Sequence, residues 1–314
     1  MTHSLVIPVY RNEESIDALI AVVAAIQDRV GQPVEAVFVV DGSPDRCFEL
    51  LRFRLPTAPF PSQLVLLSRN FGSFAAIRVG LEKASGSLIA VMSADLQEPA
   101  DLIVEMFAKL QSGDSDVVVG IRIGRNDPFL RRVASRIFWG LYRRMVLPEM
   151  PPGGVDVFGC TSAIRDQLLR LKEARSSLVG QLFWLGFRRS EVPYQRMPRH
   201  AGRSTWTLRK RLNYLTDSVY AFTDLPIRLL TVTGLVGILV SVAFGSITLV
   251  ARLLGWFSVP GYTVTVGLLL FFGSLNLFGL GLVGSYAWRG YENTKARPVA
   301  IPMLAERFGG KHDT

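Results

Sequence analysis

Short runs of apolar residues recur through the first 120 positions, and each run ends in a cluster of polar residues. The segments between them, such as residues 16–30, place apolar residues at helical spacing. Continuous apolar runs that alternate with helical segments are typical of a parallel sheet buried on both faces. The runs that predict strands cover residues 4–9, 34–40, 64–67, 88–92 and 116–120. We therefore expect an α/β fold whose strands end at one polar edge.

Two much longer apolar stretches follow in the last third of the chain. Residues 229–251 form 23 positions without a charged residue or His, and residues 253–288 form 36 more, with Arg252 between them. A helix of 23 residues is about 34 Å long, enough for the roughly 30 Å hydrocarbon core of a bilayer. Buried helices of a large soluble core are the alternative, but they are rarely this long without a charge. We expect two transmembrane helices, 228–252 and 261–288, that form a hairpin.

Basic residues flank this predicted hairpin on both sides. They are Arg209, Lys210, Arg211, Arg228, Arg289, Lys295 and Arg297. By the positive-inside rule both flanks lie in the cytoplasm, and the first apolar run is too short for a signal peptide. We expect a multi-pass protein of the inner (plasma) membrane, with the catalytic domain and both termini in the cytoplasm. The expected parts are a cytoplasmic domain over 1–205, an amphipathic juxtamembrane helix over 206–227, the two spans, and a cytoplasmic tail over 289–314.

The distribution of charge along the chain explains an otherwise contradictory composition. The 314 residues are 49% hydrophobic and 19% charged, with a mean hydropathy of +0.29 and a net charge of +9. Residues 1–119 carry a net charge of −6, residues 120–228 carry +12, and residues 229–314 carry +3. These values exclude a disordered chain and a collagen-like repeat. Two cysteines are too few for a disulfide framework or a metal knuckle, so we expect a reducing compartment.

The basic central block contains two segments with the pattern of amphipathic helices. Residues 128–147 place apolar side chains on one helical face and arginines largely elsewhere, and residues 206–222 repeat this pattern beside the first span. Such helices bind anionic membrane surfaces, although an ordinary helix packed on a sheet has the same pattern. Nucleic acid is not an expected partner, because a bilayer-anchored domain without a recognition motif rarely binds it.

Carboxylates follow two of the predicted strands, at Asp41 and Asp95. In open α/β sheets ligands bind beyond the carboxyl ends of the strands, and Mg²⁺ prefers oxygen ligands. Asp95 and Gln97 would point the same way if their segment is extended. The alternative is a turn or helix N-cap, with helix initiation near Pro99. The loops of this half contain neither of the glycine-rich patterns, GxGxxG or GxxxxGKS/T, that bind dinucleotides or nucleoside triphosphates.

Six motifs occur in the order found in one known family. They are IPVYRNEESI, FVVDGSPD, LSRNFG, VMSADLQEP, VVVGIR and RHAGRSTW, followed by the predicted hairpin. Over residues 4–290 the chain resembles the polyprenyl-phosphate glycosyltransferases of glycosyltransferase family 2, such as dolichyl-phosphate mannose synthase and bactoprenyl-phosphate glucosyltransferases. The resemblance implies a GT-A fold, which is Rossmann-like with a mostly parallel sheet, and inverting sugar transfer from a nucleotide sugar to a lipid phosphate. It also implies Mg²⁺ or Mn²⁺ as cofactor and a homo-oligomer.

The resemblance also assigns roles to residues at matching positions. The implied nucleotide-binding residues are Pro8, Tyr10, Glu13, Asp41, Asn70, Gly72 and Asp95, and the implied metal ligands are Asp95 and Gln97. Acceptor or phosphate binding falls to Arg122, Arg131, Arg199 and Ser204, and catalysis to Asp95, Asp156, Arg122 and Arg199. A phosphate acceptor, whose second pKa is about 6, needs no strong base. We therefore expect Asp156 to orient the sugar or acceptor rather than to abstract a proton.

Three positions depart from the motifs of this family. Val40 replaces the first Asp of the nucleoside pair, Ser93 replaces the first Asp of the metal motif, and Thr205 stands where Lys is common. With Ser93 the metal motif keeps one carboxylate and one amide. We therefore expect weak metal binding without nucleotide, and a cation that arrives largely with the donor diphosphate.

The sequence thus predicts transfer of a hexose to undecaprenyl or a similar polyprenyl phosphate, for cell-envelope glycan modification. UDP-glucose is the first donor expected, and GDP-mannose or a UDP-amino sugar is the alternative. A processive synthase is disfavoured because the Gln-x-x-Arg-Trp motif is absent from the sequence. The alternative outside enzymes is a non-catalytic accessory protein that binds lipid-linked sugar.

Overall fold

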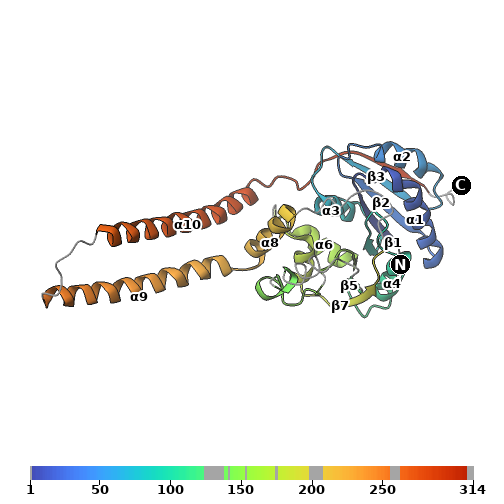
Figure 1. The fold of residues 1–314 in the computed structure, drawn as a ribbon. Helices are drawn as coiled ribbons and strands as arrows, with labels where there is room; N and C mark the ends of the chain where they lie inside the picture. Colours follow the sequence, from blue (N-terminus) through green and yellow to red (C-terminus); the bar gives the residue numbers. More distant parts are fainter. Residues whose placement is uncertain are drawn as a thin grey trace.

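A computed structural model describes residues 2–123, 138–140, 142–152, 154–173, 176–197, 208–254 and 262–309. Within these ranges helices cover both faces of an eight-stranded sheet, and two long helices extend away from it (Figure 1). The strand order is β7-β5-β6-β4-β1-β2-β3-β8. The α/β fold predicted from the alternating apolar runs is confirmed, and so is the Rossmann-like sheet that the family resemblance implies.

Four parallel strands form the centre of the sheet. They are β1 (His3–Val9), β2 (Val34–Val40), β3 (Ser62–Leu67) and β4 (Leu88–Val91). The register pairs Val9 of β1 with Val40 of β2, and Val40 with Leu66 of β3. Because the strands run in one direction, the loops that follow them emerge at the same edge.

Helices pack against both faces of these strands, which explains the continuous apolar runs. Leu5, Ile7 and Val9 of β1 belong to an apolar cluster on one face, and Val6 belongs to a second cluster on the other. The first cluster contains side chains of α1 (Ile16–Val30), α2 (Cys47–Arg54) and α4 (Ala100–Gln111), and the second those of α3 (Ser73–Lys83). Two short 3-10 helices, η1 (Glu13–Ser15) and η2 (Leu55–Thr57), lie in the connections.

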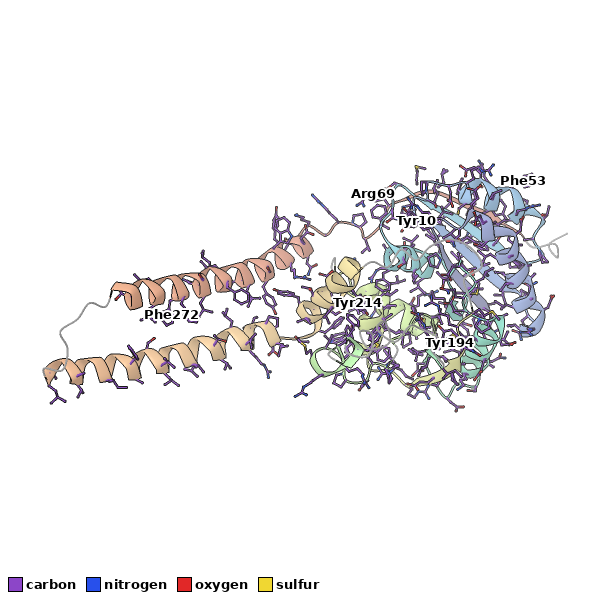
Figure 2. All side chains as sticks on the ribbon, viewed as in Figure 1. Tyr10, Phe53, Arg69, Tyr194, Tyr214 and Phe272 are labelled. Carbon is purple, nitrogen blue, oxygen red and sulfur yellow. The ribbon has the colours of Figure 1, made fainter. Side chains whose placement is uncertain are left out.

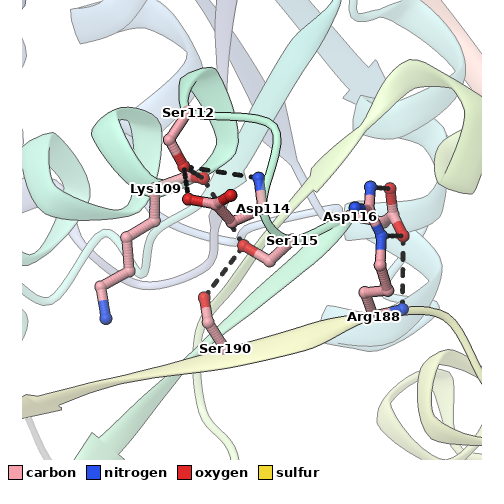
Figure 3. Close-up of polar contacts among 7 residues, drawn as sticks. All are labelled: Lys109, Ser112, Asp114, Ser115, Asp116, Arg188 and Ser190. Carbon is pink, nitrogen blue, oxygen red and sulfur yellow. Dashed lines mark hydrogen bonds and ion pairs between the residues drawn. The ribbon is translucent and has the colours of Figure 1, made fainter.

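Three further strands beyond β4 make the sheet mixed. They are β5 (Val117–Arg122), β6 (Phe158–Thr161) and β7 (Arg189–Tyr194), with α6 (Ser162–Arg170) and α7 (Leu178–Trp184) in their connections. β6 runs antiparallel to β4 and β5, whereas β7 runs parallel to β5. Polar contacts connect the chain at the starts of β5 and β7. Arg188 donates to Asp116 at 2.9 and 3.0 Å, and the Ser115 and Ser190 hydroxyls lie 3.0 Å apart (Figure 3).

Three helices follow β7, and the last two of them form the long extension of the molecule. They are α8 (Leu208–Phe222), α9 (Leu225–Leu253) and α10 (Tyr262–Thr294). α9 and α10 lie side by side away from the sheet, with Phe272 of α10 labelled between them in Figure 2. Within the described part of the chain, one helical segment, Leu225–Ile247, is long and apolar enough to cross a membrane. Its side chains are exposed, as Leu239 is at 62%.

The basic segment 128–147 is described only in part. Residues 138–140 and 142–145 are helical, and the preceding residues 128–137 lie outside the described ranges. Tyr142 of this helical segment is fully buried and stacks on Tyr214 of α8, with ring centroids 5.8 Å apart. This part of the segment is therefore anchored to α8, and a membrane-surface role for the whole segment stays a prediction.

The segment after α10 returns to the sheet. β8 (Pro302–Phe308) runs antiparallel to β3, with Ser62 opposite Phe308, and forms the last strand at that edge. An ion pair of 2.9 Å between Arg52 of α2 and Glu306 of β8 joins it to the domain. The sequence analysis treated residues 289–314 only as a tail and did not foresee this strand.

Candidate active site

The loops after β1, β2 and β3 meet at the carboxyl edge of the sheet. Asp41, directly after β2, is 2% exposed. Its two carboxylate oxygens accept hydrogen bonds from the backbone N–H of Phe71 at 2.7 Å and of Gly72 at 2.8 Å. The Asn70 side chain donates to the Asp41 carbonyl at 3.3 Å. Three residues predicted to bind nucleotide, Asp41, Asn70 and Gly72, are thus brought together.

Burial raises the pKa of Asp41, although the two N–H donors and the charge of Arg69 lower it. The next residue, Gly42, has φ +54°, and a Cβ placed there would lie 2.2 Å from the carbonyl carbon of Arg69. Only glycine fits this close approach between the loops after β2 and β3. The structure therefore gives Asp41 a loop-clamping contact, and direct contact with nucleotide stays a prediction.

The loop after β1 reaches the same place from the other side. Glu13 accepts hydrogen bonds from the backbone N–H of Arg46 at 3.1 Å and from its Nε at 2.9 Å, and these bonds lower the pKa of Glu13. The Arg11 guanidinium lies 5.4 Å from the ring centroid of Tyr10. Pro8 is half-buried within β1, opposite Val39 of β2. Tyr10 and Arg69 lie toward the β3 side of the domain in Figure 2, and Tyr194 lies toward the β7 side.

The loop after β4 carries the two predicted metal ligands, Asp95 and Gln97. Leu96 between them has φ +57°, so the segment is a turn and not extended, which favours the turn alternative over the extended one. The Gln97 backbone N–H donates to Asp95 at 3.4 Å. The Gln97 side chain donates to the Met197 carbonyl at 3.2 Å and accepts from Arg196. Gln97 is thus connected to the chain after β7.

The predicted site residues Arg122 and Asp156 form an ion pair. Arg122 ends β5, Asp156 precedes β6, and Tyr194 ends β7 opposite Arg122 and donates to Asp156 at 3.2 Å. Burial lowers the pKa of Arg122, but Asp156 and Tyr194 together outweigh this effect, so the pKa of Arg122 is raised. Burial also raises the pKa of Tyr194, so its hydroxyl keeps its proton and acts as a donor. An Asp held by two donors is suited to orienting a ligand.

Glu98 is a buried carboxylate in the loop after β4 that was not predicted from the sequence. It is 2% exposed, and its Oε2 accepts from the N–H of Ser93 at 3.2 Å and from the Ser93 hydroxyl. Burial raises the pKa of Glu98 to about 7, with contributions from the charges of Asp95 and Asp156. Its signal in the sequence is weak, because an acidic residue before a helix start is common on protein surfaces.

Three predicted site residues, Arg131, Arg199 and Ser204, lie outside the described residues, as does Thr205. Within the described residues no group of three or more His, Cys, Asp and Glu side chains is arranged to hold a metal ion. The loop after β4 nevertheless carries oxygen donors, namely the Asp95 carboxylate, the Ser93 hydroxyl and the Gln97 amide oxygen, which accepts from Arg196. This donor set fits Mg²⁺ or Mn²⁺ as a partial site that needs further oxygens from a ligand.

Comparison with known proteins gives the family. Residues 4–171 match the model of glycosyl transferase family 2. An undecaprenyl-phosphate 4-deoxy-4-formamido-L-arabinose transferase of Edwardsiella ictaluri is 34% identical over 94% of this chain and 91% of its own length. A prophage-derived bactoprenol glucosyl transferase of Shigella flexneri is 30% identical over 98% and 99%, and an uncharacterised glycosyltransferase of Synechocystis is 29% identical over 95% and 93%. The chain therefore belongs to glycosyl transferase family 2.

Proposed function

We propose that this protein transfers a hexose from a nucleotide sugar to undecaprenyl or a similar polyprenyl phosphate, with inversion, at the cytoplasmic face of the plasma membrane. The product would be a polyprenyl-phosphate sugar for cell-envelope glycan modification. The observation that carries the proposal is similarity over nearly the whole chain to relatives named for sugar transfer to undecaprenyl phosphate and bactoprenol. UDP-glucose is the first donor to test, since several of these relatives are named glucosyl transferases.

The described site residues have different roles in this proposed reaction. An oxygen of the acceptor phosphate attacks the anomeric carbon, the bond to the nucleoside diphosphate breaks, and negative charge develops on the leaving diphosphate. Arg196, which donates to Gln97, and Arg122, which pairs with Asp156, are cations able to stabilise that charge. Asp156, held by Arg122 and Tyr194, accepts hydrogen bonds from the sugar and orients it. No residue has to remove a proton from an ionised phosphate.

A divalent cation, Mg²⁺ or Mn²⁺, fits this reaction because it neutralises part of the diphosphate charge when bound. Asp95 and Gln97 are the residues proposed to hold it, with water and the donor diphosphate completing its shell. Since the protein supplies few charged ligands, the affinity for cation without nucleotide should be low.

The return of β8 to the sheet supports a membrane topology with two crossings. The segments before α8 and after α10 both belong to one domain, because β7 and β8 lie in the same sheet. If α9 crosses the bilayer, α10 must cross back for β8 to pair with β3. On this proposal the catalytic domain and both termini lie on one side of the membrane, and by the positive-inside rule this side is the cytoplasm. A homo-oligomer stays an expectation from the resemblance.

A cavity of about 520 Å³ at the base of the two long helices supports a lipid acceptor. It lies where the helical segment before Val146 meets α8, α9 and α10. Its lining combines apolar side chains such as Met145, Phe222 and Ile227 with the basic Arg144 and the acidic Asp224. The Asp224 carboxylate is paired with Arg228 at 2.8 Å. This combination suits a molecule with an isoprenoid chain and an anionic headgroup.

The deciding experiment incubates the full-length protein in membranes with polyprenyl phosphate, Mg²⁺ or Mn²⁺, and a panel of labelled nucleotide sugars. We expect label in the lipid phase from one donor, and a loss of at least about tenfold in the Asp95→Asn variant. Asp114→Asn is the matched control, because Asp114 is an exposed carboxylate outside the site. If the native protein labels lipid with no donor, the proposal fails and the accessory-protein alternative gains.

A second donor class is favoured by a specific observation. The relative with the highest identity among those compared is named for an amino-sugar derivative, 4-deoxy-4-formamido-L-arabinose. The donor panel therefore includes a nucleotide-linked amino sugar as well as UDP-glucose and GDP-mannose. Transfer from such a donor alone would replace the hexose assignment and leave the reaction class unchanged.

A further inference from the structure

The position where the family's metal motif begins holds Ser93, and this serine has a buried carboxylate as partner. Ser93 lies two residues after the end of β4, and Glu98 lies two residues before α4. Both the backbone N–H and the hydroxyl of Ser93 donate to the same oxygen of Glu98. The other oxygen, Oε1, is buried without a hydrogen-bond partner among the described residues.

A buried carboxylate with one unpartnered oxygen is costly, and a purely structural loop contact does not require it. Glu98 is 2% exposed, so bulk water has little access to this oxygen. The geometry around Glu98 therefore calls for a reason beyond the loop contact itself.

The chemistry of the hydroxyl indicates how Glu98 can act. A serine hydroxyl has one proton and two acceptor lone pairs, and here the proton is directed to Glu98. The lone pairs therefore stay available as oxygen ligands, and a carboxylate behind the hydroxyl makes them better donors. Ser93 is half-buried whereas Glu98 is fully buried, so Ser93 is the member of the pair that a bound ligand can reach.

We propose that Ser93 and Glu98 together replace the missing first aspartate: the Ser93 hydroxyl contacts the divalent cation of the donor complex, and Glu98 is the positioning residue that accepts the hydroxyl proton and orients the lone pairs of the oxygen. The inference rests on the cation site of the proposed function. A simple loop contact between Ser93 and Glu98 would affect only the stability of the fold. The proposed role requires Glu98 to affect Mn²⁺ binding through the Ser93 hydroxyl.

The test measures Mn²⁺ binding to the full-length protein in detergent, by electron paramagnetic resonance of the free ion, with and without UDP. In the presence of UDP we expect Ser93→Ala and Glu98→Gln each to weaken Mn²⁺ affinity by about 10- to 100-fold. The Ser93→Ala/Glu98→Gln double variant should bind Mn²⁺ no more weakly than Ser93→Ala alone. Thermal unfolding of each variant checks that the fold is intact.

Ser112→Ala is the matched control. Ser112 is an exposed serine whose hydroxyl also donates to a carboxylate, that of Asp114 at 3.0 Å, at the far end of α4 (Figure 3). Its replacement should leave Mn²⁺ affinity unchanged. Ser93→Asp tests for a gain of Mn²⁺ affinity instead of a loss. In the Glu98→Gln background it should restore native affinity, because an aspartate carboxylate is an oxygen ligand that needs no partner behind it.

Three results would overturn the inference. They are native Mn²⁺ affinity in Ser93→Ala, an equal effect of Glu98→Gln with and without the Ser93 hydroxyl, and no Mn²⁺ binding by the native protein with UDP. The proposed function fails separately, when the native protein binds Mn²⁺ in the expected pattern and yet transfers no label to lipid. Conversely, labelled lipid together with native Mn²⁺ affinity in Ser93→Ala rejects the inference alone.

Discussion

Asp41 and Glu98 are both buried carboxylates at the carboxyl edge, but their surroundings differ. Two backbone N–H groups bind the two oxygens of Asp41, so its burial is compensated within the fold. Glu98 has donors on only one oxygen within the described part of the chain. At the scale of single residues, Asp41 is therefore complete without a ligand, whereas Glu98 is the group whose environment a ligand would improve.

His3 provides a pH-dependent contribution to stability far from the site. It is 1% exposed at the start of β1, packs edge-on against Phe107 at 4.8 Å, and neither ring nitrogen has a hydrogen-bond partner among the described residues. Burial lowers the pKa of His3. Protons therefore bind preferentially to the unfolded chain, and stability should fall as the pH drops below about 6.5.

The measurement is thermal unfolding of the native protein and of His3→Leu at about pH 8 and about pH 5.5. We expect the native midpoint to fall more between these values than the midpoint of His3→Leu, which has no proton to bind at this position. Equal losses in the two proteins would show that His3 does not carry the effect.

Individual site residues could be predicted from the sequence where a motif fixed a loop. Asp41 with Gly42 and the pair of Asp95 and Gln97 are of this kind, since their spacing after an apolar run already placed them at the edge. Glu98 could not be predicted, because its role depends on burial between β4 and α4, and a sequence of polar residues does not reveal which of them is enclosed. The Arg122 and Asp156 contact depends on strand order, which also lies beyond local pattern.

At the scale of elements, β1 to β5 could be predicted from the sequence, whereas the later strands could not. The first five are apolar runs whose central members are buried on both faces, and this pattern is readable directly. β6 has only four residues, and β7 contains Pro193 and alternates buried with exposed positions. β8 is mostly exposed, as an antiparallel edge strand is, so it resembled a polar tail.

β8 should nevertheless contribute to stability. Without residues 302–314, β3 becomes the edge of the sheet, its backbone loses the antiparallel ladder, and Phe308 no longer packs against the core. We expect this truncation to destabilise the domain by about 2 kcal/mol or more, which lowers the unfolding midpoint by several degrees and promotes aggregation.

Glu306→Gln is the control for this truncation. It breaks the ion pair with Arg52, which is 59% exposed, and should cost less than about 1 kcal/mol because exposed ion pairs contribute little. A truncated protein with the native unfolding midpoint would mean that β8 is dispensable, and the argument for two crossings would lose its structural basis.

At the scale of the whole molecule, the pairing of β8 with β3 ties the chain after α10 to the sheet domain. The chain therefore leaves the domain through α9 and returns to it through α10. Arg289 near the end of α10 pairs with Asp217 of α8 at 2.7 Å and lies 4.5 Å from the ring centroid of Tyr220. Both helices are thus attached at the domain end, and Leu253 at the other end of α9 is 78% exposed. If the two long helices span the bilayer, Leu253 lies on the side opposite to the sheet.

Thiol labelling tests this arrangement, because the native background is low: Cys47 and Cys160 are buried, and burial raises the pKa of each thiol to about 12. In intact cells a membrane-impermeant maleimide should label Leu253→Cys and spare Ser112→Cys, whose position on the domain is also exposed. Permeabilised cells should give label at both positions, since thiol exposure is then the only requirement. If Leu253→Cys were protected in intact cells as fully as Ser112→Cys, α9 would not cross the membrane. The basic residues of segment 120–228 would then be expected to bind the membrane surface without a transmembrane helix.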